Sequence, residues 1–103
     1  MVESYHLPTA TNKLPAPLKT EFTDAAEKGA FITEVVNVST KAMQEADEKY
    51  RQFLYKEAHA EYIVSLDGFM YLMKQTQDDA NFQAFCKTKL TYLLDKVSSS
   101  SIF

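Results

Sequence analysis

The stretch that decides the fold is residues 22–53, FTDAAEKGAFITEVVNVSTKAMQEADEKYRQF. Alternating steps of three and four residues place ten positions on one helical face, and eight of these ten are apolar when tyrosine is counted. This is the pattern of an amphipathic helix, with Thr20 or Thr23 as the expected N-cap. The face consists of Phe22, Ala25, Gly29, Ile32, Val36, Ser39, Met43, Ala46, Tyr50 and Phe53.

The length of this helix is left open by residues 35–40, VVNVST, because β-branched side chains lose rotamer freedom in a helix. One arrangement ends the helix within this run and starts another. A second continues it unbroken to about Val64, and a third makes residues 31–38 a strand. We favour helix throughout, with a bend near Asn37.

Farther along the chain, Asp67-Gly68 is the clearest predicted break, because glycine weakens a helix interior and Asp-Gly favours turns. A last helix is expected over residues 79–97, opened by Thr76 and Asp79 at the spacing of a capping box, with Asp78 as the alternative cap. Its buried face would hold Phe82, Cys86, Leu90, Leu93 and Val97. The predicted fold is therefore all-α, either a helical hairpin or a small three- to four-helix bundle with short connections.

The N-terminal region is different, because all three prolines lie within residues 5–18. Proline fixes its own φ and pushes the preceding residue toward extended geometry, so an extended arm is predicted. The arm either folds over its own helices, lies along a partner or forms a disordered tail. We divide the chain into this arm (1–19), a helical domain (20–97) and a polar C-terminal tail (98–103).

Length and composition exclude several classes of protein. A chain of 103 residues with 46% hydrophobic residues has room for one small domain. A net charge of −3 and a single arginine argue against nucleic-acid binding. No apolar run approaches the roughly 20 residues of a membrane span, and no secretory signal is expected. The lone Cys86 fits a reducing intracellular compartment, either the cytoplasm or an organelle entered by import and processing.

Catalytic and metal-binding motifs are not found. His59 lies between Glu57 and Glu61, but neighbours two residues apart on a helix point to different faces. Cys86 shares an apolar face and is expected in the core. The sequence also lacks a Gly-x-Ser-x-Gly elbow and a glycine-rich phosphate loop. We therefore expect no metal, no cofactor and no enzymatic activity.

Aromatic residues make up 13% of the chain and gather in its middle. They cannot all face one core, because Phe53 and Tyr55 would lie about 200° apart around a helix. Some should therefore reach the surface, where aromatic side chains favour protein contacts. The candidate partner-binding residues are Tyr5, Leu7, Leu14, Leu18, Tyr55, Tyr62, Tyr71 and Phe103.

These features predict a small non-enzymatic structural or accessory subunit, which binds protein partners or its own copies in a larger assembly. Two alternatives stay open. One is a regulatory protein that inhibits a single enzyme through the same surfaces. The other is a helical bundle that binds a small ligand.

Overall fold

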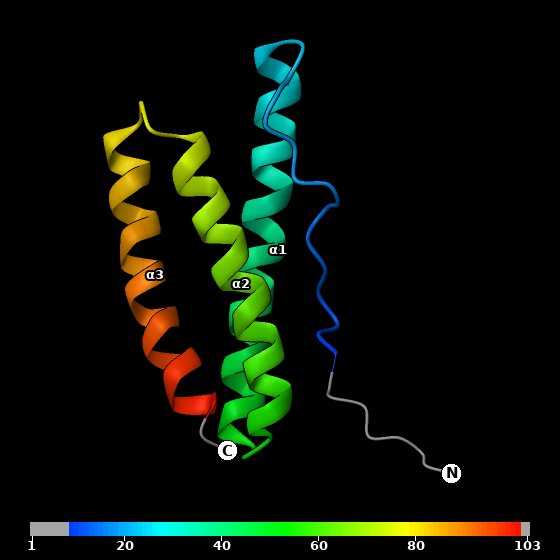
Figure 1. Ribbon diagram of the computed structural model, residues 1–103, viewed down its shortest axis with the longest axis vertical. Coiled ribbons are helices and arrows are strands. Elements are labelled where there is room, and N and C mark those ends of the chain that lie inside the picture. The colour runs from blue at the N-terminus through cyan, green and yellow to red at the C-terminus, as the bar shows by residue number, and fades with distance from the viewer. Residues whose placement is uncertain (1–8, 102–103) are drawn as a thin grey trace.

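The chain forms three helices preceded by an extended arm, in a computed structural model that describes residues 9–101 (Figure 1). The helices are α1 (Ala25–Arg51), α2 (Tyr55–Gln75) and α3 (Ala80–Ser101). Residues 9–101 contain no strand, so the all-α prediction is confirmed in its three-helix form. The strand considered for residues 31–38 is wrong, because these residues lie within α1.

The first helix begins and ends differently from the prediction. Its N-cap is Asp24, whose carboxylate accepts a hydrogen bond of 2.8 Å from the Glu27 amide. Thr23 instead donates its hydroxyl to the Glu27 side chain at 2.6 Å. The helix passes through residues 35–40 without interruption and stops at Arg51, well before Val64.

The second helix runs through Asp67-Gly68 without a break, so the predicted turn there is wrong. Gly68 is buried where α2 crosses α1. A Cβ atom at this position would lie 1.8 Å from Ser39 Oγ and 3.0 Å from Ser39 Cβ. Close approach of the two helices therefore requires a residue without a side chain, and packing overrides the low helix propensity of glycine.

The third helix is opened by Asp79, whose carboxylate accepts a hydrogen bond of 3.0 Å from the Phe82 amide. It continues to Ser101, so residues 98–101, which were assigned to a tail, are helical. Cys86 is buried, as predicted. Burial raises the pKa of its thiol, and the protonated form is therefore favoured.

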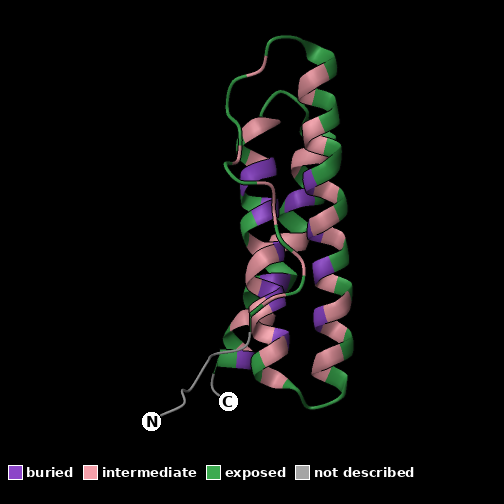
Figure 2. Ribbon diagram, turned by 90° about the vertical axis from the view of Figure 1, so that its right-hand side faces the viewer, coloured by how far each residue is buried: buried purple, intermediate pink, exposed green. Residues whose placement is uncertain are grey.

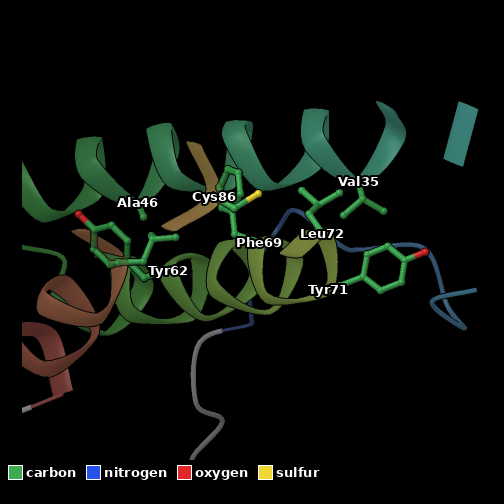
Figure 3. Packing of buried hydrophobic residues seen from close by; sticks show 9 residues of the cluster. Val35, Ala46, Tyr62, Phe69, Tyr71, Leu72 and Cys86 are labelled. Carbon is green, nitrogen blue, oxygen red and sulfur yellow. The ribbon is translucent and has the colours of Figure 1, made fainter. Parts of the chain in front are cut away.

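The core lies on both sides of α2, which packs against α1 and α3. Figure 3 shows Tyr62, Phe69 and Leu72 of α2 filling the space beneath α1. The buried apolar cluster combines all three helices and consists of Val35, Ala46, Ala58, Tyr62, Phe69, Tyr71, Leu72, Cys86 and Leu93.

One carboxylate joins the three helices. Asp47 of α1 accepts hydrogen bonds from the hydroxyls of Tyr62 in α2 (2.5 Å) and Tyr92 in α3 (2.7 Å). Burial, followed by these bonds to Asp47, raises the pKa of Tyr62 and brings that of Tyr92 to about 12. Both tyrosines therefore act as neutral donors to Asp47 across the physiological pH range.

The described part of the arm folds over its own helices, in the groove between α1 and α2 (Figure 2). Its polar residues meet Glu61, which is completely buried in α2. Glu61 accepts hydrogen bonds from Thr11 N (2.7 Å), Thr11 Oγ1 (2.8 Å) and Asn12 Nδ2 (3.0 Å). Burial alone would raise the pKa of Glu61, but the hydrogen bonds from the arm outweigh it and lower the pKa. The carboxylate is therefore favoured in its charged form, and its hydrogen bonds hold the arm against α2.

Candidate functional site

Four of the eight predicted partner-binding residues pack within the fold itself. Leu14 and Leu18 are partly buried against the core, as the arm covers the helices. Tyr62 and Tyr71 are buried. Their hydroxyls donate to the Asp47 carboxylate and to the Lys19 carbonyl oxygen. The expectation that these tyrosines reach the surface is therefore wrong.

The other four candidate partner-binding residues do not contribute to the core. Three of the candidates lie outside the described residues, namely Tyr5, Leu7 and Phe103. Tyr55 lies at the end of the molecule where α1 connects to α2, and it is half-buried. This connection, residues 51–56, is hereafter called the aromatic turn.

The aromatic turn exposes the most accessible large apolar side chain of residues 9–101. Phe53 is 75% exposed and its neighbour Leu54 is 41% exposed. The sequence pattern had placed Phe53 on the buried face of a continuous helix. The structure corrects this, because α1 has ended two residues earlier.

The backbone of the turn gives a second reason to single out Phe53. Its φ is 66°, in the left-handed region that favours glycine. The Phe53 amide donates to Tyr50 O (3.0 Å) and the Leu54 amide to Lys49 O (2.9 Å), which is the Schellman arrangement at a helix end. A non-glycine residue there costs about 1–2 kcal/mol. Since an exposed ring recovers little of this by burial, fold stability does not explain phenylalanine at this position.

Aromatic contacts hold the turn in place. The rings of Phe53 and Tyr55 are 6.2 Å apart, those of Tyr55 and Tyr50 are 5.0 Å apart, and those of Tyr50 and Tyr62 are 6.4 Å apart. All three pairs meet edge to face. The ammonium group of Lys96 lies 4.6 Å from the ring centre of Tyr50. A continuous series of rings therefore connects exposed Phe53 to the core.

An exposed ion pair lies beside the apolar side chains of the turn. Arg51 Nη2 contacts Glu48 Oε1 at 2.6 Å, and both side chains are more than half exposed. The hydrogen bond from Arg51 lowers the pKa of Glu48. Such an exposed pair adds little to stability. An apolar centre with a charged rim is the usual anatomy of a protein–protein contact surface.

Sequence reasoning missed Phe53 and Leu54 because residues 51–54 contain no glycine, proline or asparagine to mark a turn. The available signal was the run Phe53-Leu54-Tyr55. Three consecutive large apolar residues cannot share one face of a helix, so at least one had to be exposed.

Other candidate chemistry is limited. His59 Nδ1 lies 2.8 Å from Ser100 Oγ, which joins α2 to the end of α3. Residues 9–101 bring together no group of three or more side chains suited to a metal ion. None of the helices in this range is long and apolar enough to cross a membrane. Comparison with protein-family models, curated proteins and solved structures finds no match to this chain.

Proposed function

We propose that this protein is a non-enzymatic binding subunit, which inserts the aromatic turn into an apolar pocket of a protein partner. The observation that carries the proposal is Phe53, a 75% exposed ring held at a φ of 66°. Natural sequences retain such strain where the side chain has a use outside the fold. Large aromatic side chains also supply much of the binding energy when they fill a partner's pocket.

The aromatic series strengthens this proposal through the entropy of binding. Immobilising a free side chain at an interface costs about 0.5–1.5 kcal/mol. Phe53 already contacts Tyr55, which in turn contacts Tyr50. Part of the conformational entropy of the Phe53 side chain is therefore already lost when the protein folds, and less is lost on binding.

The decisive experiment places a photo-crosslinking amino acid at position 53 of the full chain. A second sample carries it at position 94, because Leu94 is 55% exposed on α3 and lies outside the turn. Partners crosslinked in an extract of the source cells are identified, purified and mixed with the unlabelled protein. We expect one stoichiometric complex that is recovered from position 53 and not from position 94.

The Phe53→Gly variant then tests both the role of the ring and its strain. Glycine adopts a positive φ freely, so the free energy of unfolding should stay within about 0.5 kcal/mol or increase. Binding to the purified partner should fall by about 10-fold or more, as for a truncated hot spot. Chemical denaturation and titration calorimetry measure the two quantities.

Two outcomes would contradict the proposal. If Phe53→Gly binds the partner as tightly as the parent protein, the aromatic turn is not the contact surface. If the variant loses more than about 1 kcal/mol of stability, Phe53 serves packing and its exposure carries no argument. Leu94→Ala provides the control, with both quantities expected to stay unchanged.

A further inference from the structure

A groove of about 790 Å³ runs along the outer face of α2, between residues 9–14 of the arm and the end of α3. Of the aromatic turn it includes Lys56, whereas Phe53 and Leu54 do not line it. Its volume falls within the range of small-molecule sites. The side chains of Ala60, Ile63 and Val64 line it from α2, and that of Leu14 lines it from the arm. A ligand lying there would therefore contact a mainly apolar surface.

The groove also carries unbalanced positive charge. Lys13 of the arm and Lys56 of α2 line it, and neither forms an ion pair with another residue of the range 9–101. The acidic lining residue is Asp67, about 17 Å from Lys56 along α2 at 1.5 Å per residue. An anionic group would therefore be favoured at the Lys56 end of the groove.

His59 adds a directed polar group at this same end. Its Nδ1 lies 2.8 Å from Ser100 Oγ, and Ser100 Oγ donates its proton to Lys96 O at 2.8 Å. The contact between Nδ1 and Ser100 fixes the orientation of the His59 ring. His59 lines the groove one helical turn from Lys56.

We propose that this groove binds an amphipathic anion, a molecule with a linear apolar chain and one terminal carboxylate. The carboxylate lies near Lys56, and Lys13 on the arm supplies a second positive charge along the groove. The chain of the ligand lies over Ile63, Val64 and Leu14. Phe53 and Leu54 do not line the groove, so the outcome of the test below does not decide the proposed function.

The test uses decanoate as the probe, with decan-1-ol and decyltrimethylammonium as ligands of equal chain length and different headgroup charge. Titration calorimetry on the full chain measures each affinity below the concentration at which micelles form. We expect decanoate to bind about 10-fold more tightly than the alcohol, because charge-assisted hydrogen bonds are the stronger ones. The cationic ligand should bind most weakly.

Variants locate the site. Lys13→Gln combined with Lys56→Gln should abolish the preference for decanoate over the alcohol. Lys28→Gln combined with Lys87→Gln makes the same change in net charge outside the groove and should preserve that preference. Ile63 is half-buried at the floor of the groove, so Ile63→Gln should lower the affinities for both decanoate and decan-1-ol about 10-fold or more.

Circular dichroism on every variant checks that the helices are intact. Equal affinity for the three headgroups would show apolar adhesion only and would overturn the proposal. Absence of decanoate binding would overturn it as well. An unchanged affinity in the Ile63→Gln variant would place any observed binding elsewhere on the protein.

Discussion

Replacing Glu61 with alanine should lower the free energy of unfolding by about 2–4 kcal/mol and release the arm from the α1–α2 groove. The Glu61 side chain is 1% exposed and lies 3.9 Å from Lys49 Nζ. It also accepts hydrogen bonds from Thr11 and Asn12. Its removal would leave the Thr11 amide without its acceptor, whereas Asn12 Nδ2 would keep its hydrogen bond of 2.8 Å to Glu45 Oε1. Chemical denaturation measures the stability, and the rate of trypsin cleavage after Lys13 and Lys19 measures release of the arm.

Glu48 provides the matched control, because it is also a paired glutamate but lies on the surface. Glu48→Ala should change stability by less than about 1 kcal/mol and leave trypsin cleavage of the arm slow. If Glu61→Ala behaves like Glu48→Ala, the buried carboxylate does not hold the arm. Glu61→Gln keeps the side-chain shape and should give an intermediate loss.

The lowered pKa of Glu61 fixes the sign of its pH dependence. Its folded pKa is depressed, so its contribution to stability is present above the unfolded value of about 4.3. That contribution is lost as pH falls through the lower, folded pKa. Below pH 4.3 the parent protein should therefore lose more stability than Glu61→Gln, as measured by denaturation at a series of pH values. Parallel curves for the two proteins would contradict this assignment.

The second large effect is expected at Gly68, where Gly68→Ala should destabilise the fold by about 1–3 kcal/mol. In an exposed helix the same change would be stabilising, because alanine is the better helix former. Here the added methyl carbon meets Ser39 Oγ, at 1.8 Å if nothing moves. Thermal and chemical denaturation measure the loss.

Gly29 supplies the matched comparison within the same chain. A Cβ there meets no atom within 4 Å, so Gly29→Ala should stabilise the protein by about 0.5–1 kcal/mol. Ser39→Ala should recover part of the loss in Gly68→Ala, because it removes the clashing hydroxyl. Ser39 Oγ has no hydrogen-bond partner among the described residues, so the single change Ser39→Ala should cost little. If the change in unfolding free energy of the double variant equals the sum of the two single changes, the contact between residues 39 and 68 is contradicted.

Helical periodicity was enough to predict the fold class and much of the buried face of α1. Val36, Met43 and Tyr50 all pack against the core as their spacing indicated. The buried position of Cys86 also followed from its neighbours on α3. These predictions succeed because each depends on the burial of apolar side chains at a regular interval.

The helix boundaries failed for a specific physical reason. Glycine occurs both in turns and at close contacts between helices. Gly68 belongs to the second kind, because a side chain there would overlap Ser39 of α1. The left-handed position between α1 and α2 holds Phe53 instead, a residue that gives no turn signal. Local propensity therefore predicted a break in the middle of α2 and missed the real one.

The candidate site was even less accessible to sequence reasoning. Tyr62 and Tyr71 resemble half-buried Tyr55 by residue type, but they are buried and their hydroxyls donate to internal acceptors on Asp47 and Lys19. Glu61 is an acidic residue that would ordinarily be placed in solvent. Its burial depends on donors 50 residues earlier in the chain, and no local pattern contains that information.

The docking of the arm also sets an order of events during synthesis. Thr11 leaves the ribosome before its acceptor Glu61, which follows 50 residues later. At about 5–20 residues per second, that separation amounts to several seconds. The first part of the described chain to be made is therefore among the last to reach its native place. Throughout that interval Leu14 and Leu18, which pack against the core in the folded protein, stay exposed to solvent and to any chaperone that binds apolar side chains.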